Sequence, residues 1–386
     1  FFSAANFLAY GNNLSVVRAV GSTALNSSSK DGGSTRIQNS SEFADTLLST
    51  DNENVFGAFI SRYPGALGNS LTVTVIDTGD STRDDLFSTV PGTSDFVSNV
   101  GGEDDEIHIV VTDSGGLFTG VKDTVLETYP FVSKASDAIN LNSGSTNYYK
   151  QVVFNSSRYI YAVDPSDYSN THSTWGTTAS NKTFASITPK SITYSLSGGT
   201  DEVPTDGQTI SGFNHFNNKE TIDISLLLTG NNSVAVQQSV IDIAKSRADA
   251  VAFVSPPSTV ITSATPDSVV STWASSTLSR ETSYAVADSG WKYQFDKYNN
   301  VYRWIPLNGD VAGLCVNTDT VRDPWFSPAG FNRGSIKNCI KLAWNPNQAQ
   351  RDTLYPVGVN PVVTFPGQGT LLYGDKTLLN KPNAFD

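Results

Sequence analysis

Alternating apolar and polar residues mark the first half of the chain as rich in strands. Residues 71–77 and 107–111 follow a period of two, which is the spacing of a strand with one buried face. Residues 14–20 and 159–163 are further runs that also read as strands. The remaining patterned segments of this half predict a strand over residues 151–154 and short helices over residues 3–9, 121–129 and 135–141.

The pattern changes after residue 199, where compact apolar runs alternate with helical spacing. Residues 222–228 and 250–254 are short apolar runs of the kind found in buried strands. Ser233 can cap a helix between them, in which Val236 and Val240 share one face. Strands that alternate with helices in this way form parallel sheets with helical crossovers. The second half is therefore predicted to be α/β.

Aromatic side chains recur at every second position near residue 293. Trp291, Tyr293 and Phe295 alternate with polar residues, and Asn299-Asn300 suits the positive φ of a tight hairpin turn. Two interpretations fit this stripe. One is a hairpin that buries one face in the core, and the other is a platform for a sugar or a nucleobase. We adopt the core hairpin because it needs fewer assumptions.

These patterns predict a chain of mixed α+β and α/β class with two domains. Residues 42–195 would form a β-rich inserted domain. Residues 1–20 and 196–386 would form a discontinuous α/β domain, with a mixed sheet flanked by helices. The inserted domain would then interrupt the other domain once, close to its amino-terminal end.

The segment between the two domains has a different composition. Residues 21–41 are rich in Gly, Ser and Asn and contain almost no apolar residue, so they read as a linker. Residues 1–20 are too few to build a core alone. We therefore expect residues 14–20 to lie in the same sheet as the strands within residues 222–254, where they would cover a sheet edge.

The charge balance narrows the partners that the chain can bind. Its 386 residues include 25 Lys and Arg against 37 Asp and Glu, a formal net charge of −12. So acidic a surface opposes binding to the phosphates of nucleic acids. No apolar run reaches about 18 residues, so no membrane-spanning helix is predicted. We expect neither direct nucleic-acid binding nor stable membrane contact.

A search for catalytic and metal-binding motifs finds none. His108, His172 and His215 lie in a predicted strand, loop and helix; His215 has no His or Glu at four-residue spacing, and no HExxH motif occurs. We interpret His108 as a strand residue on the solvated face. The acidic run at residues 103–106 has the oxygen ligands that Ca²⁺ prefers, but it lacks the alternating spacing of a calcium loop. A solvated turn is the preferred interpretation.

The two cysteines do not change this result. Cys315 and Cys339 lie too far apart for a CxxC motif. Cys315 is in a predicted helix and Cys339 is in an apolar run, so we expect buried free thiols. The sequence therefore predicts no catalytic, cofactor-binding or metal-binding residues, and no cofactor.

Several short motifs occur in the order found in one protein family. The most specific are Y-P-G-A-L-G-N at residues 63–69, S-P-A-G-F-N-R-G at 327–334 and L-Y-G-D-K-T at 372–377. In this order they resemble contractile tail sheath proteins of T-even-type myophages. The resemblance is strong over residues 280–380 and thin over residues 80–180. Its other motifs lie at residues 10–20, 196–199, 254–257, 293–299, 303–307, 310–315, 348–352 and 360–362.

The resemblance implies a structural subunit and not an enzyme. Sheath subunits of this family assemble as stacked six-subunit rings around the tail tube, between the baseplate and the tail terminator. They are built in a high-energy extended state and contract when the baseplate triggers them. The resemblance also implies a virion protein that is assembled in the host cytoplasm.

Two departures from the family pattern shape the expected boundaries. Larger members carry an outward-facing domain where this chain has only the linker-like residues 21–41. The chain also begins after the family's amino-terminal arm and stops before its carboxy-terminal domain, so we interpret it as a fragment.

The rival function from another class is a virion carbohydrate-active enzyme or glycan-binding module, which the acidic composition and the aromatic stripe favour. A bacterial injection-system sheath would share the fold.

Overall fold

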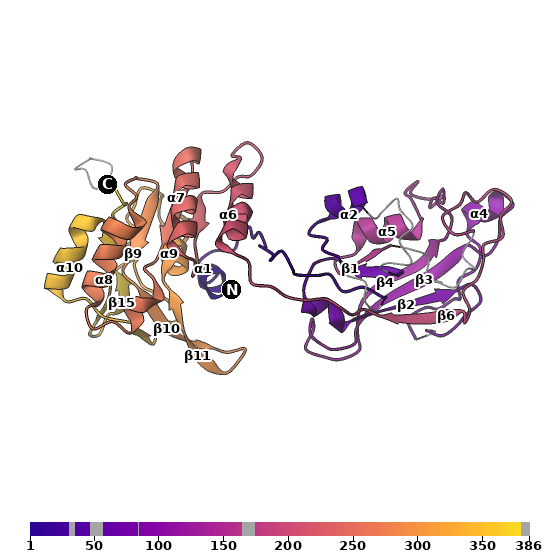
Figure 1. The fold of residues 1–386 in the computed structure, drawn as a ribbon, viewed down its shortest axis with the longest axis horizontal. Helices are drawn as coiled ribbons and strands as arrows, with labels where there is room; N and C mark the ends of the chain where they lie inside the picture. The colour runs from indigo at the N-terminus through magenta and orange to yellow at the C-terminus, as the bar shows by residue number, and fades with distance from the viewer. Residues whose placement is uncertain (31–34, 47–56, 84, 164–173, 380–386) are drawn as a thin grey trace. The chain divides into compact units, whose positions relative to one another are not determined.

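The computed structural model describes residues 1–30, 35–46, 57–83, 85–163 and 174–379. The chain folds into two compact units, which are drawn with all their elements in Figure 1. Unit 1 contains Phe1–Ala19 and Pro204–Asp386, and unit 2 contains Val20–Val203. Unit 2 is therefore inserted near the start of unit 1. No helix in the described ranges is long and apolar enough to cross a membrane.

The centre of unit 1 is a four-stranded sheet with the order β13-β9-β8-β7. Its strands are β7 (Leu226–Leu228), β8 (Val251–Val254), β9 (Ala285–Asp288) and β13 (Val359–Asn360), and each pairs in parallel with its neighbour. Parallel pairing follows from the helices that connect successive strands. The sequence analysis expected a mixed sheet, whereas this sheet is parallel throughout.

Helices cover both faces of this sheet. On one face, α7 (Val234–Arg247) and α8 (Pro266–Thr272) contribute to a core with Leu227, Ala252 and Ala285. On the other face, α1 (Phe2–Phe7) and α9 (Asn308–Val321) contribute to a core with Leu226 and Phe253. Successive strand residues thus alternate between two helical layers, as the pleat requires.

Helix α1 lies close to α9 because two glycines of α9 leave room for it. A Cβ atom added at Gly309 would lie 2.2 Å from the backbone oxygen of Ser3, and one at Gly313 would lie 2.4 Å from the ring of Tyr10. The two glycines are four residues apart and share one face of α9. The amino-terminal segment is therefore held against α9 by close contact.

The rest of unit 1 consists of short antiparallel strands and helices. A hairpin of β10 (Trp291–Asp296) and β11 (Val301–Pro306) extends to β12 (Lys341–Leu342). Asn300 has a φ of 54°, so the predicted hairpin turn is confirmed. The remaining elements are β14 (Val362–Phe365), β15 (Gly369–Leu372), α6 (Asp206–Asn214), α10 (Gln348–Leu354), η2 (His215–Asn217), η3 (Ser258–Ile261), the π-helix η4 (Trp273–Leu278) and η5 (Tyr355–Val357).

Unit 2 is built on an antiparallel sheet with the order β4-β3-β2-β6. The strands are β2 (Leu71–Asp77), β3 (Glu106–Asp113), β4 (Thr124–Ser133) and β6 (Ser191–Ser195). Alternate residues of β2 and β3, such as Val73 and Ile109, are fully buried in its core. The other elements of unit 2 are the pair β1 (Phe59–Ser61) and β5 (Ile160–Ala162), the helices α2 (Ser40–Thr46), α4 (Asp95–Asn99) and α5 (Tyr149–Ser156), and η1 (Ala66–Ser70).

Three predictions for unit 2 were wrong. Residues 121–129 were expected to be helical but supply most of β4, which pairs with β3 along its length. Residues 151–154 were expected to be a strand but lie in α5, which places Tyr149 and Val153 in the core. Residues 135–141 contain no helix. For β4, the pairing with β3 outweighs the local helical pattern.

Residues 21–30 and 35–41 belong to unit 2 and do not form a free linker. Asn26 is fully buried and accepts a hydrogen bond from the backbone of Ile37 at 2.7 Å. Leu25 forms an antiparallel bridge with Thr200, and the backbone N–H of Thr23 donates to the side chain of Glu202. The chain thus passes into unit 2 and out of it at the same place.

The predicted strand at residues 14–20 is absent from every described ladder. Residues 14–19 belong to unit 1, where Leu14 packs against the same core cluster as Leu226 and Leu228 of β7. A groove of about 490 Å³ lies between this segment, β7 and α6. The segment therefore lies next to the expected sheet without pairing with it.

Candidate functional site

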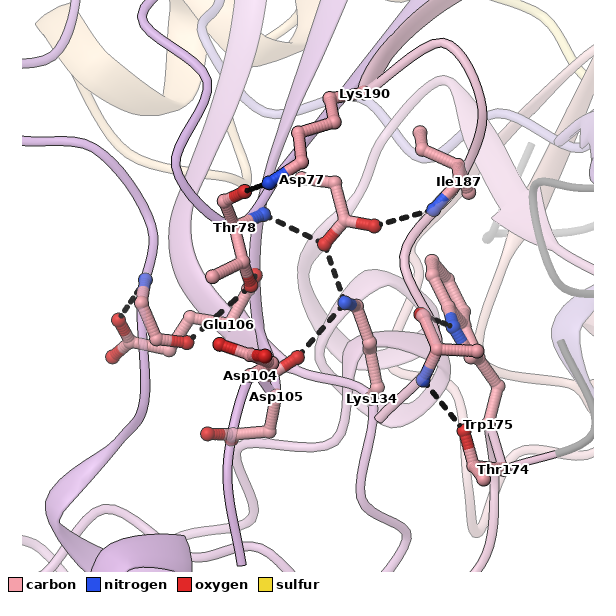
Figure 2. Close-up of polar contacts among 12 residues, drawn as sticks. Asp77, Thr78, Asp104, Asp105, Glu106, Lys134, Thr174, Trp175, Ile187 and Lys190 are labelled. Atoms are coloured by element: carbon pink, nitrogen blue, oxygen red, sulfur yellow. Dashed lines mark hydrogen bonds and ion pairs between the residues drawn. The ribbon is translucent and has the colours of Figure 1, made fainter. Parts of the chain in front are cut away.

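A buried ion pair in unit 2 lies in a network of polar contacts (Figure 2). The Nζ atom of Lys134 contacts Oδ1 of Asp77, and both side chains are completely inaccessible to solvent. Lys134 also donates to the backbone oxygen of Asp104 at 2.9 Å. The other carboxylate oxygen of Asp77 accepts from the backbone N–H of Ile187 at 2.7 Å. The pair therefore joins strands β2 and β4 to two loops.

The surroundings of Lys134 indicate a structural role. Burial lowers the pKa of Lys134, and the charge of Asp77 opposes this effect. Trp175 covers the ammonium group, with its ring centre 5.2 Å from Nζ. A lysine nucleophile needs access to its substrate as well as a lowered pKa. Lys134 is closed to solvent and to any substrate. Its charge instead stabilises the contact between the end of β2 and the residue that follows β4.

The acidic run at residues 103–106 is only partly a solvated turn, so that interpretation needs correction. Asp105 is fully buried, and its carboxylate accepts hydrogen bonds from the side chains of Ser94 and Ser133 and from the backbone of Ser94. Glu106 accepts from the backbone of Gly92 at 2.9 Å. These carboxylates hold the loop before α4 against β3 through protein donors.

His108 is buried, which contradicts its predicted position on the solvated face. Its ring lies between those of Phe87 and Phe131, with centres 4.1 and 4.5 Å away. Nδ1 accepts from the backbone N–H of Phe131, so Nε2 carries the proton and donates to the backbone oxygen of Thr89. Burial lowers the pKa of His108. The residue is a neutral core histidine.

The other predicted candidates lie apart. His215 begins η2 in unit 1, and His172 lies outside the described residues. Cys315 and Cys339 are free and partly buried, and burial raises the pKa of Cys315 to about 12. Among the described residues, no group of three or more His, Cys, Asp or Glu could hold a metal ion.

Unit 1 contains a second buried ion pair, which connects the β10–β11 hairpin to α9. Nζ of Lys292 lies 2.8 Å from Oδ1 of Asp310, and both side chains are about 1% exposed. Lys292 also donates to the backbone oxygen of Lys337 at 2.8 Å. Burial raises the pKa of Asp310, and the charge of Lys292 opposes the shift. Asp310 was predicted to cap a helix, but it lies in the first turn of α9 and pairs with Lys292.

A third polar cluster lies at the carboxyl ends of the parallel strands. The hydroxyl of Ser255, after β8, donates to Asp288 at the end of β9 at 2.5 Å. Ser255 in turn accepts from the backbone and side-chain nitrogens of Asn308 at 3.0 and 2.9 Å. Burial raises the pKa of Asp288 to about 8. Ligands of open α/β sheets bind outside these strand ends. Here the polar groups at the ends of β8 and β9 bind the start of α9.

Sequence reasoning singled out none of these clusters as a site. Asp77 and Asp288 each come at the end of an apolar run. A single acidic residue at the end of a buried strand was the sequence signal that could have indicated these clusters. Lys134 is 57 residues from Asp77, so only the fold brings them together. All three clusters connect elements of one unit, and this arrangement serves rigidity.

The family comparison agrees with the motifs in the sequence. Residues 205–378 match the family described as phage tail sheath protein central domain. The tail sheath protein of Vibrio phage KVP40 is 40% identical over 215 residues, which cover 50% of this chain and 32% of that protein. The predicted resemblance to tail sheath proteins of T-even-type phages is thereby confirmed. The tail sheath protein of Enterobacteria phage T4 is 38% identical over 210 residues, with the same two coverages.

One longer match to a tail sheath protein covers the whole chain. The tail sheath protein of Salmonella phage ViI is 28% identical over 457 aligned positions, which cover 100% of this chain and 71% of that protein. Among solved structures, the sheath tail protein of Listeria innocua aligns with 99% of this chain and 73% of its own, at 10% identity and a TM-score of 0.47. The chain spans about a third of the length of the KVP40 and T4 tail sheath proteins.

Proposed function

We propose that this chain is part of a structural subunit of a phage contractile tail sheath. The subunit polymerises as stacked six-subunit rings around the tail tube and contracts to drive the tube through the host envelope. The match of residues 205–378 to the tail sheath central domain carries the proposal. The baseplate and the tail terminator are its further partners. Its location is the virion, after assembly in the host cytoplasm.

The buried polar clusters support a structural role for the chain. The pairs Lys134–Asp77 and Lys292–Asp310 are closed to solvent and bond to backbone groups of neighbouring segments. Breaking such a pair leaves an uncompensated buried charge, which strongly penalises local deformation. A subunit that transmits force benefits from bodies that resist deformation. We infer that the subunit is not an enzyme.

The distribution of charge supports different positions for the two units. Unit 1 has 15 Lys and Arg against 15 Asp and Glu, whereas unit 2 has 10 against 22. The whole net charge of −12 therefore resides in unit 2. Like charge on identical subunits opposes close association. We infer that residues 42–195 are peripheral, that residues 1–20 and 196–386 lie nearer the tube, and that residues 21–41 stand where larger relatives carry an outer domain.

Contraction in this proposal uses strain stored in the polymer. Each unit has its own buried core, so each can move as a rigid body while contacts between subunits change. The energy comes from the difference between two arrangements of the same subunits. The process uses no cofactor and no nucleotide hydrolysis.

Immunoelectron microscopy of phage particles that encode this sequence tests the proposal. Antibodies against unit 2 are expected to label the tail along its full length, before and after contraction. A capsid antibody is the matched control, because it labels the same particles away from the tail. Labelling confined to the tail tip would overturn the proposal and favour a glycan-binding or carbohydrate-active component.

A further inference from the structure

The β10–β11 hairpin carries a ladder of four aromatic side chains on one face. The strand register pairs Tyr293 with Trp304 and Phe295 with Tyr302. Paired residues of an antiparallel ladder point to the same face, and so do residues two positions apart. The ring centres of Tyr293 and Trp304 are 4.8 Å apart, those of Phe295 and Tyr302 5.1 Å, and those of Tyr293 and Tyr302 5.4 Å.

The outer part of this aromatic ladder is open to solvent. Phe295 is 44% exposed and Tyr302 is 53% exposed, although both are large apolar side chains at strand positions. The interpretation of the stripe as a core-facing hairpin holds for Trp291, which is buried, and for Trp304, which packs against the same core, but it is wrong for Phe295 and Tyr302. Burial of an exposed aromatic side chain is strongly favourable, so a contiguous patch of this kind marks an interaction site.

The opposite face of the hairpin is already occupied within unit 1. Lys292 on that face is buried with Asp310, and the guanidinium of Arg303 lies over the ring of Phe2 in α1, 5.9 Å from its centre. Asp296 on the same face accepts from Nε of Arg303 at 2.8 Å. Lys292 and α1 therefore cover much of the opposite face, although Val301 at its turn end is exposed.

The ring geometry favours a protein partner over a sugar. Sugars stack on the faces of aromatic rings, and the rings of Tyr293 and Tyr302 already stack on each other with an interplanar angle of 17°. Tyr302, which is 53% exposed, offers an apolar ring and a hydroxyl group to a protein surface. Tyrosine and tryptophan are also the residue types enriched at protein–protein hot spots.

Basic side chains flank the aromatic ladder and favour an acidic partner. Nζ of Lys341 lies 5.1 Å from the ring centre of Tyr293 and 5.6 Å from that of Trp304. Lys297 lies over Tyr298 at the hairpin turn, 5.2 Å from the ring centre. The chain itself supplies an acidic surface, because unit 2 has 22 acidic against 10 basic residues. A neutral unit 1 with a basic rim complements that surface.

We propose that the aromatic ladder and its basic rim form a docking surface for the acidic unit 2 of a second copy of this chain. This inference rests on the proposed function, since it names one contact through which sheath subunits meet. The aromatic residues supply the buried area, and Lys341 and Lys297 select the acidic surface. The contact is weak between free copies and becomes significant at the high local concentration of a polymer.

Sedimentation equilibrium of the full chain at about 1 mM, the effective concentration of a short tether, measures this contact. We expect reversible association that weakens as salt is raised, because opposite charges are screened. Tyr302→Ala and Lys341→Glu should each weaken it about tenfold, the effect of losing a hot-spot side chain. Val301→Ala is the matched control, because Val301 lies on the same strand with similar exposure but on the opposite face.

Several results would overturn the docking proposal. The first is absence of association by the unmodified chain, and the second is equal effects of Tyr302→Ala and Val301→Ala. Strengthening by Lys341→Glu would also contradict it. A fourth is quenching of tryptophan fluorescence by a glucan or chitin oligosaccharide that Tyr302→Ala abolishes, which would identify a glycan site. Circular dichroism and urea midpoints establish that each variant folds. Tail labelling by microscopy does not depend on this surface, so the two proposals fail separately.

Discussion

Lys134 and Asp77 form an ion pair that solvent does not reach. In Lys134→Met the ammonium group is lost while the carboxylate of Asp77 stays buried. Removing one partner of a buried pair typically costs about 3–5 kcal/mol. We therefore expect the free energy of unfolding of unit 2 to fall by about that amount, measured by urea denaturation.

Lys190→Met provides the control for this prediction. Lys190 is exposed and donates to the backbone oxygen of Thr78 at 2.8 Å, beside the same cluster (Figure 2). Surface substitutions usually change stability by less than about 0.5 kcal/mol. If the two variants lost equal stability, the buried pair would not be a major support of unit 2.

Asp288 makes the stability of unit 1 depend on pH. Its folded-state pKa of about 8 lies above the ordinary value of 3.8, so the folded chain holds a proton that the unfolded chain releases. The free energy of unfolding therefore falls as pH rises from about 4 to about 8, by at most about 1.4 kcal/mol per pH unit from this group. Asp288→Asn removes this titration.

Urea unfolding of both proteins across this pH range tests the prediction. The variant is expected to gain stability relative to the unmodified chain as pH rises. Asp352→Asn, at an exposed position in α10, should leave the pH dependence unchanged. Parallel curves for the unmodified chain and Asp288→Asn would mean that Asp288 is ionised in the folded state.

The close contact between α1 and α9 depends on glycine residues of α9, which have no side chain at the contact. Gly309→Ala would place a Cβ atom 2.2 Å from the Ser3 backbone, so α1 must shift. Forcing an extra methyl group into a tight contact usually costs about 1–3 kcal/mol. We expect a lower unfolding free energy and faster amide hydrogen exchange in residues 2–10.

Gly207→Ala is the matched control for this helix contact. Gly207 lies in the first turn of α6, where an added Cβ meets only Thr205 at 4.0 Å. Replacing a helical glycine with alanine in open space should stabilise by about 0.5–1 kcal/mol. Equal destabilisation at both positions would contradict the close approach of α1 to α9.

Local pattern predicted the elements of unit 1 better than those of unit 2. Residues 250–254 and Ser233 gave β8 and the cap of α7, because crossover helices and strands alternate over short distances. In unit 2, residues 121–129 became a strand because β3, more than ten residues earlier, supplies the hydrogen bonds. The buried clusters were not predictable for the same reason, since Lys134 and Asp77 meet only after β2, β3 and β4 have formed.

For the whole molecule, the charge of unit 2 opposes self-association in dilute solution. All of the net charge of −12 resides there, and repulsion between copies exceeds weak contacts at low concentration. We expect the chain to sediment as a monomer at micromolar concentration and moderate salt. Rings or tubes under these conditions would show that the two units alone drive polymerisation.

The chain enters and leaves unit 2 at neighbouring segments, and this affects how the sequence can diversify in evolution. Leu25 and Thr200 bridge where the chain passes into and out of unit 2, so the two ends of the insertion lie side by side. A domain with adjacent ends can be exchanged, enlarged or lost while its host keeps its own fold. The adjacent ends of unit 2 thus permit its replacement as a whole domain. Descendants of one ancestor can present different inserted domains while they conserve unit 1.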